Sequence, residues 1–320
     1  MAETLLTIQH GDKVFSPPVI DGVQIEWERS GTPGKLTFTV VKVPNAGMDF
    51  AEGDLVCFYY DDKRVFMGYV FTKSRDKEHH IKVTCYDQLR YFKNKFSYVF
   101  ENKRADEIIR SLCGDFGLNL GTVENTKYLI PTIAEENTTA FDICLSALDE
   151  TLVNAGEMFI LYDKAGSITL QNATSMISET LICEDTAENF DYSSSIDEET
   201  YNSVVLYYKG EDGTFIPYTA SNSDRINAWG TLRYFEEVKV PSVGQAKANQ
   251  LLELYSRKTR TLSIKNAFGS IDVRGGTLIP VQLNLGDIRT NNYMIVEKVT
   301  HKFTQDHYTM DLTLEGAWED

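Results

Sequence analysis

Apolar and polar side chains alternate along the first hundred residues, with the period of a strand that buries one face. Val23, Ile25 and Trp27 are separated by single polar residues, and the alternation resumes at Leu36–Val40 after the turn Ser30–Gly34. This pattern predicts a β-hairpin. Further strands are expected at Leu55–Tyr60, Val65–Lys73 and Ile81–Tyr86. A run of short strands joined by turns is typical of a small antiparallel barrel or sandwich.

The spacing of apolar residues becomes helical near Asn102. Gly114 can end a first helix, whose buried face consists of Ala105, Ile108, Ile109, Leu112 and Cys113. A second helix is expected after Thr139, because Thr139 and Asp142 resemble a capping box. A hairpin over Met158–Tyr162 and Ile168–Gln171 follows. This region is therefore predicted to be a small α+β insert.

The strand pattern returns after Tyr201. The predicted strands are Val204–Tyr208, Thr214–Tyr218, Trp229–Phe235, Leu262–Asn266, Leu278–Leu285, Tyr293–Phe303 and Tyr308–Leu314. One helix, over about residues 242–257, interrupts them; Ser242 and Gln245 resemble its capping box.

The last strands resemble the first in sequence. Three pairs of segments match: Gly53–Val56 with Gly276–Ile279, Met67–Lys73 with Met294–Thr300, and His80–Cys85 with His307–Leu312. Such similarity can also arise between two unrelated meanders. The expected fold is mainly β, with two tube-like antiparallel β-barrel domains related by this weak internal repeat and flanking the α+β domain. The expected limits are residues 1–100, 101–178 and 179–320.

The charge of the chain excludes several classes of function. Its 31 Lys and Arg residues against 47 Asp and Glu give a net charge of −16. Nucleic-acid readers and polybasic membrane-surface proteins need a basic face, so neither is expected. The longest apolar stretches, such as Leu55–Tyr60, are too short to span a bilayer, so no membrane insertion is expected. The N-terminus lacks the pattern of a signal peptide. The five cysteines are scattered through apolar runs, as reduced buried thiols of a cytosol-made protein are.

A search for catalytic or cofactor-binding motifs finds none. There is no G-x-G-x-x-G, Walker A, H-E-x-x-H or G-x-S-x-G sequence, and no cofactor or metal is expected. His79 and His80 are predicted to lie in a solvated turn rather than at a metal. Glu157, before an apolar strand, comes nearest to a catalytic acid, but a strand entrance is the better explanation for it.

Several short motifs together resemble the baseplate hub proteins of contractile phage tails and phage-tail-like bacteriocins. This family includes the late-control D proteins, the N-terminal part of VgrG spikes and the XkdQ/YqbQ-like hubs. The similar segments are Arg104–Ile109, Glu136–Asp142, Gly156–Phe159, Tyr201–Val205, Trp229–Gly230, Ala246–Tyr255 and Val299–Phe303. Together they extend over essentially the whole chain.

The resemblance implies a non-enzymatic structural adaptor. Family hubs are homotrimers that join a hexameric tail tube protein to a trimeric central spike protein, with tape-measure and baseplate wedge or LysM-type proteins as further partners. Two similar barrels per chain would convert three-fold into six-fold symmetry. The expected location is the tail baseplate of a virion or bacteriocin particle, assembled in the bacterial cytoplasm. Within the loop Val41–Gly53, we expect ring contacts at Pro44, Asn45, Gly47 and Met48; an ordinary surface loop is the alternative.

Two other functions stay open from the sequence. Lytic domains accompany such hubs, so a tail-associated peptidoglycan hydrolase is one alternative. A cell-surface or carbohydrate-binding module is the other.

Half of the net charge lies in one segment. Residues 165–208 contain eight acids and no Lys or Arg. A solvated linker would explain this composition. A more specific hypothesis is that the acids line or rim a channel and repel a polyanion passing through it. The channel-lining candidates are Glu184, Asp185, Glu188 and Asp191.

Overall fold

The structure is a computed structural model that describes residues 3–41, 49–186, 188–197, 199–210, 213–284 and 289–316. Its N-terminal part consists of seven strands: β1 (Thr4–His10), β2 (Lys13–Phe15), β3 (Val19–Glu28), β4 (Lys35–Val41), β5 (Leu55–Tyr60), β6 (Lys63–Arg75) and β7 (His80–Tyr86). The predicted hairpin is β3–β4, with Ile25 opposite Leu36.

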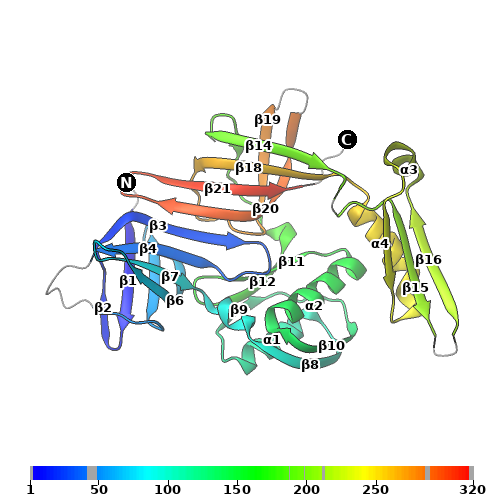
Figure 1. Cartoon of the computed structure of the whole chain (residues 1–320), viewed down its shortest axis with the longest axis horizontal. Helices are drawn as coiled ribbons and strands as arrows, with labels where there is room; N and C mark the ends of the chain where they lie inside the picture. Colours follow the sequence, from blue (N-terminus) through cyan, green and yellow to red (C-terminus); the bar gives the residue numbers. More distant parts are fainter. Residues whose placement is uncertain are drawn as a thin grey trace.

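The insert follows as a compact α+β unit below the strands in Figure 1. Its elements are the 3-10 turn η1 (Gln88–Lys93), β8 (Lys95–Lys103), α1 (Ala105–Asp115), β9 (Leu120–Val123), β10 (Ile130–Thr139), α2 (Ala140–Ala155), β11 (Phe159–Asp163), β12 (Ile168–Asn172) and the 3-10 turn η2 (Ala173–Ser175). Both predicted helices are confirmed, and Thr139 caps α2 by accepting a hydrogen bond from Asp142 N at 3.0 Å. β8 pairs with β10 of the insert, and this pairing begins at Lys95.

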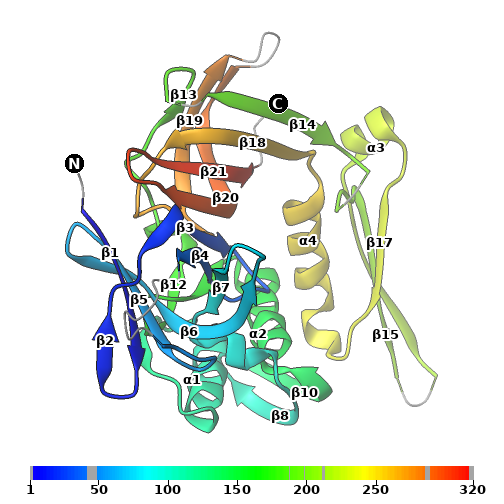
Figure 2. The same ribbon diagram turned by 60° about the vertical axis from the view of Figure 1, so that its left-hand side comes forward.

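The C-terminal part contains strands β13 (Ile182–Cys183), β14 (Asn189–Ser195), β18 (Thr259–Phe268), β19 (Leu278–Asn284), β20 (Arg289–Phe303) and β21 (Tyr308–Glu315). Between β14 and β18 the chain forms a separate unit of β15 (Ser203–Lys209), β16 (Phe215–Ser221), α3 (Ser223–Trp229), β17 (Arg233–Glu237), η3 (Pro241–Val243) and α4 (Gly244–Tyr255). In both views this unit stands beside the main sheet, with α4 on its inner side (Figures 1 and 2).

Two local predictions in this unit are wrong. A strand was predicted from Trp229 onward, but Trp229 is the last residue of helix α3 and β17 begins only at Arg233. The helix forms because Asn222 caps it by accepting a hydrogen bond from Arg225 N. Ser242 and Gln245 form no capping box. Residues 241–243 form the turn η3, α4 has no side-chain cap, and Gln245 Nε2 donates to Thr219 O.

Both halves of the chain contribute to one 13-stranded sheet, in the order β14-β18-β21-β20-β3-β4-β7-β6-β5-β1-β2, with β19 beside β20 and β13 beside β19. The mainly antiparallel β fold is thus confirmed. Among the described residues the two halves do not close as separate barrels. The reason is the length of β20, whose first part pairs with β19 while its second part pairs with β3.

The internal repeat is confirmed by strand order. In the first half the neighbours run β3-β4-β7-β6-β5, and in the second half they run β14-β18-β21-β20-β19, with every pair antiparallel. Two unrelated meanders need not share this order, because β7 and β21 each insert beside a strand that is not their sequence neighbour. The two halves are therefore structural copies of one five-stranded unit.

A turn before the third strand of each copy makes the same hydrogen bonds. Gly53 N donates to Val70 O at 2.8 Å, and Gly276 N donates to Val296 O at 2.7 Å. Both glycines have positive φ, +94° and +88°, which a residue with a side chain rarely adopts. The reciprocal bonds are also shared, from Val70 N to Asp54 O and from Val296 N to Thr277 O, both 2.9 Å.

The hydrogen-bond register corrects part of the sequence match. Gly53 and Gly276 are equivalent, as the sequence indicates. The second match is displaced by one residue, since Gly68 and Met294 occupy the same position opposite Val56 and Ile279. The third is displaced by two, since Cys85 lies opposite Val70 and Leu314 lies opposite Val296. A slip of two residues leaves an alternating pattern unchanged, whereas a slip of one residue exchanges the two faces of the strand.

One hydrophobic core joins the two copies. It includes Ile25, Leu36 and Phe58 from the first copy and Leu262 and Val299 from the second, all buried. A separate core fills the insert, and a third lies between α4 and β15. No helix within the described ranges is long and apolar enough to cross a membrane.

Candidate functional site

The two copies meet at one strand pair, which we call the repeat junction: Val23–Glu28 of β3 against Lys298–Phe303 of β20. The strands are antiparallel, with Lys298 opposite Glu28 and Phe303 opposite Val23. One face of this pair packs into the core, while the other, the polar face, continues across both copies. At the repeat junction, the two copies are joined by backbone hydrogen bonds between β3 and β20.

Ion pairs cross the polar face of the junction. Lys298 Nζ lies 2.9 Å from Glu28 Oε1 and 3.2 Å from Glu26 Oε2, and Lys35 Nζ lies 2.7 Å from Glu26 Oε1. Burial alone would raise the pKa of Glu26, but the hydrogen bonds from Lys35 and Lys298 outweigh it and hold the pKa below its ordinary value. These pairs favour one register, because a slip by one residue would place the acids on the core face.

The core face of the junction contains a buried histidine. His301 Nε2 lies 2.9 Å from Val273 O, and Nδ1 lies 2.8 Å from Tyr308 Oη. Because a carbonyl only accepts, Nε2 carries the proton and Nδ1 accepts from the tyrosine hydroxyl. Burial lowers the pKa of His301 to about 4. The ring, 5.1 Å from that of Trp27, is a neutral structural element.

This histidine predicts an acid-sensitive junction. Its pKa falls from 6.5 in the unfolded chain to about 4 in the folded one, so the unfolded chain binds the extra proton between these values. The contribution of His301 to the free energy of unfolding is present above pH 6.5 and decreases as the pH falls. At pH 4.5 the decrease amounts to about 2.5 kcal/mol. Urea unfolding at pH 7 and pH 4.5 measures the loss. His301→Gln is expected to be less stable than the parent chain at pH 7 but to lose less stability between pH 7 and pH 4.5. An equal loss in both proteins would contradict the assignment of the acid sensitivity to His301.

A cationic side chain holds three parts of the chain together beside the junction. The Arg274 guanidinium lies 4.7 Å from the Trp27 ring centre and 4.0 Å from that of Tyr162, and Nη2 donates to Asp163 O at 3.1 Å. Trp27 comes from the first copy, Tyr162 and Asp163 from the insert, and Arg274 from the second copy. We call these four residues the Arg274 cluster.

The Arg274 cluster contains one buried carboxyl, that of Asp163, and a second one, that of Asp87, lies beside it. Asp163 Oδ2 accepts from Gln88 N at 3.3 Å and from Gln88 Nε2 at 3.1 Å, and Asp87 Oδ2 accepts from Gly34 N at 2.8 Å. Burial, reinforced by the Asp163 carboxylate, raises the pKa of Asp87 well above its ordinary value, while Arg274 opposes the rise. The carboxyls hold turns in place by accepting backbone N–H groups, which is a structural role.

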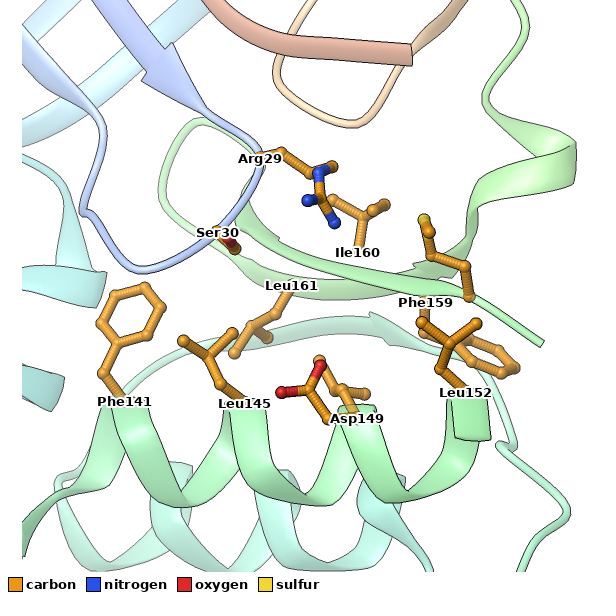
Figure 3. Close-up of a pocket in the computed structure, with 11 residues that line it drawn as sticks. Arg29, Ser30, Phe141, Leu145, Asp149, Leu152, Phe159, Ile160 and Leu161 are labelled. Carbon is orange, nitrogen blue, oxygen red and sulfur yellow. The ribbon is translucent and has the colours of Figure 1, made fainter. Parts of the chain in front are cut away.

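A small cavity lies between α2 and β11 (Figure 3). Its volume is about 140 Å³, and Leu145, Leu152 and Phe159 are among its apolar lining residues. Arg29 and Asp149 are its charged residues, and burial raises the pKa of Asp149 although Arg29 opposes this. Sites for drug-sized ligands occupy about 300–1,000 Å³, so this cavity is smaller than such a site.

The predicted site residues fall in different places. Pro44, Asn45, Gly47 and Met48 lie outside the described residues. The four channel candidates are all exposed, around β13 and β14. Asp191 alternates with Phe190 and Tyr192, so it lies on the polar face, whereas Glu184 and Asp185 are in the turn after β13. Glu188 precedes β14 and its Oε2 accepts from Asn266 Nδ2.

His79 lies in an exposed turn, as predicted, whereas His80 is half-buried and begins β7. Asp76 Oδ1 accepts from the backbone N of Glu78 and of His80, both at 2.9 Å, and His80 Nδ1 lies 3.1 Å from Asp76 Oδ2. Asp76, Glu78 and His80 are close enough to hold a cation, but the turn itself explains their arrangement. Glu157 lies at the entrance to β11 and pairs with Lys127 at 2.9 Å.

Sequence reasoning missed the Arg274 cluster and the pairing at the repeat junction. Arg274 precedes a pair of glycines at a turn, and nothing local indicates that its side chain reaches two aromatic rings. Only His301 was indicated by the sequence, because the segment Val299–Phe303, which contains it, resembles a strand of the baseplate hub proteins.

Comparison with known proteins identifies related sequences and folds. A family model described as YQBQ-like matches residues 23–315. The chain is 32% identical to the phage-like element PBSX protein XkdQ and 30% identical to the uncharacterized protein YqbQ, both of Bacillus subtilis (strain 168) and each over 92% of this chain and 91% of the relative.

Solved structures share the fold at low sequence identity. The 43 kDa tail protein of prophage MuSo2 from Shewanella oneidensis has a TM-score of 0.72 at 12% identity, over 97% of this chain and 98% of that one. The E. coli c3393 protein, a type VI secretion component described as similar to T4 tail proteins gp27 and gp5, has a TM-score of 0.54 at 12% identity, over 98% and 77% of the two chains. The fold is thus that of phage tail proteins.

Proposed function

Because the chain belongs to the YqbQ-like family, we propose that it is the baseplate hub of a contractile tail: a homotrimer that joins the hexameric tail tube to the trimeric central spike. Its place would be the baseplate of a phage or bacteriocin particle, where tape-measure, wedge and LysM-type proteins are further candidate partners. The family and the fold relate the chain to phage tail proteins. The adaptor role is our proposal.

The internal repeat is the observation that supports this role most strongly. A single chain contains two copies of one five-stranded unit, joined edge to edge at the repeat junction. Three such chains arranged around an axis would present six similar units. A ring of this kind can match six-fold symmetry on one side and three-fold symmetry on the other, which is the task of an adaptor between a tube and a spike.

We further propose that the polar face lines the channel of this ring. That face is rich in hydroxyl groups and in paired charges such as Lys302 with Asp311 at 2.8 Å and Lys265 with Asp311 at 3.1 Å. Asp191, which has no ion-pair partner among the described residues, adds negative charge near one edge, and the exposed acids Glu184, Asp185 and Glu188 lie beside it. The paired charges cancel one another, so only the exposed acids at this edge of the face would repel a polyanion.

A structural role without catalysis fits the same observations better than the hydrolase alternative. The buried carboxyls Asp87 and Asp163 accept backbone hydrogen bonds, which is a structural role. We therefore expect no loss of turbidity when the purified chain is incubated with cell walls. Turbidity loss that a single Asp or Glu substitution abolishes would favour a hydrolase instead.

Mixing the full chain with its tube and spike proteins tests the proposal. We expect light scattering to give the mass of a trimer in complex with the spike, and electron microscopy to show a ring that binds the tube on its opposite side. A chain that remains monomeric in the presence of both partners, or that binds neither, would refute the hub assignment. An acidic protein of unrelated fold serves as the control for nonspecific association with the tube and spike proteins.

A further inference from the structure

A surface groove lies beside the Arg274 cluster, where the first copy, the insert and the second copy meet. Its volume is about 320 Å³, at the lower end of the range for ligand sites. Its walls come from β3 and β6 of the first copy, from β11, β12 and the segment after them, and from the turn before β19. We call it the basic groove, after its four cationic lining residues Lys63, Arg64, Lys164 and Arg274.

The charge of the basic groove is opposite to that of the whole chain. Four cationic residues line it against one acidic residue, Asp272, whereas the chain has 31 cationic and 47 acidic residues. Lys63, Arg64 and Lys164 are exposed, and none of them forms an ion pair with another described residue. Cations that are gathered in a groove and not neutralised by neighbours create a local positive potential, which attracts a negatively charged partner.

A distortion of β6 turns three successive residues toward the basic groove. The pairing of β5 with β6 shifts register at Tyr59, so Val65 is the extra residue of a β-bulge. A bulge interrupts the alternation of a strand, which explains why Lys63, Arg64 and Val65 all line the groove. The two aspartates that precede Lys63 in the hairpin turn do not line it.

The other two cations are held by the backbone around them. In the β11–β12 turn, Lys164 N donates to Ser167 O at 2.8 Å, and Asp163 Oδ1 accepts from the backbone N of Gly166 and of Ser167. Arg274 is fixed by the contacts of the Arg274 cluster. The shape of the groove is therefore largely formed before a ligand binds, which lowers the entropy lost on binding.

The basic groove also presents apolar side chains. Ile177 is 56% exposed at the groove, Ile271 is half-buried, and Trp27 and Met176 lie deeper. An inorganic anion or a phosphate backbone has no group that could pack on these side chains. A peptide that contains both carboxylates and an apolar side chain fits the two kinds of surface at once.

We propose that the basic groove binds a short acidic segment of a partner protein, in which an apolar side chain lies between carboxylates. The carboxylates pair with Lys63, Arg64 and Lys164, and the apolar side chain packs on Ile177. A nucleic acid is the other class of polyanion, but its backbone leaves Ile177 uncovered, and the net charge of −16 repels it at long range. The groove belongs to a single chain, so this proposal stands or fails separately from the hub assignment.

A labelled peptide tests the charge of the site. The probe is fluorescein-labelled GEDFEDLEDG, and its fluorescence anisotropy with the full chain at physiological ionic strength gives a Kd. The variant Lys63→Glu/Arg64→Glu/Lys164→Glu is expected to bind the probe at least tenfold more weakly, because it replaces three attractions by three repulsions. All three positions are exposed, so we expect the variant to fold, which its thermal unfolding checks.

The matched control reverses three exposed lysines that do not line the groove, as Lys13→Glu/Lys95→Glu/Lys103→Glu. Both triple variants change the net charge equally. Charges beyond a Debye length of about 8 Å are screened, so we expect the control to bind within threefold of the parent chain. Equal weakening in both variants would overturn the proposal, because net charge alone would then explain the binding. A parent chain that does not bind the probe would also overturn it.

A second pair of variants tests the apolar part without a change of charge. Ile177→Ser is expected to weaken binding at least fivefold, whereas Leu129→Ser, at a position outside the groove that is also 56% exposed, should leave the Kd unchanged. The peptide GEDSEDSEDG keeps the acids but lacks the apolar side chains, so we expect the parent chain to bind it at least fivefold more weakly. Equal affinity for both peptides, or tighter binding of an oligothymidylate of the same length, would refute recognition of an acidic peptide.

Discussion

Replacing Gly275 by alanine is expected to lower the free energy of unfolding by at least about 3 kcal/mol, or to prevent folding. Gly275 lies in the turn before β19 and is buried against the start of the loop after β3. A β-carbon at this position would overlap the carbonyl group of Glu28 and the backbone nitrogen of Arg29. These are backbone atoms at the end of the repeat junction, so the strand and the turn would have to separate.

The first copy supplies a matched control for this substitution. Glu52 holds the equivalent turn position, and its side chain is 57% exposed. Glu52→Ala puts the same alanine into the same turn without a backbone against it, so we expect a change within about 0.5 kcal/mol. Thermal and urea unfolding of both variants measure the difference. Equal stability of the two alanine variants would show that the close approach at Gly275 does not limit the fold.

Replacing Arg274 by alanine is the second substitution with a large expected effect. It removes two cation–π contacts and the hydrogen bond to Asp163 O, and it leaves Asp87 and Asp163 without their nearest cation. We expect a loss of about 3 kcal/mol. Arg274→Lys keeps the charge but not the planar group that stacks on both rings, so about half of this loss is expected.

Arg64 provides the control for the Arg274 variants. Arg64, Tyr162 and Arg274 line one surface groove of about 320 Å³, the basic groove, but the side chain of Arg64 is exposed. We expect Arg64→Ala to change stability by less than about 0.5 kcal/mol. The fluorescence of Trp27, which Arg274 covers, should change with Arg274→Ala and not with Arg64→Ala. If both alanine variants lose the same stability, general electrostatics and not the cluster would be responsible.

Local sequence determined most of the individual elements. Period-two alternation located β3 to β7 and β18 to β21, and helical spacing with Thr139 as cap located α1 and α2. Alternation failed where polar residues fill a strand, as in β14, whose acids and serines favoured a linker. It also failed at α3, since a short helix with no buried residues has no apolar stripe to detect.

The similarity between the two halves was visible in the sequence, but its register was not. A period-two pattern looks the same after a shift of two residues, so only hydrogen bonds could place Cys85 opposite Val70 and Leu314 opposite Val296. The matching glycine turns at Gly53 and Gly276 were the one reliable marker, because positive φ restricts the residue type.

The candidate contacts depended on tertiary structure almost entirely. Arg274, Trp27 and Asp163 are far apart along the chain, and each has an ordinary local pattern. Their proximity follows from β20, which is long enough to pair with β19 and then with β3, and so joins the two copies into one sheet. The sequence by itself determined many of the strands and helices and that two of its parts are alike, because these depend on local periodicity. The structure alone decided how the parts meet, because contacts between distant segments depend on register, twist and the position of strand edges.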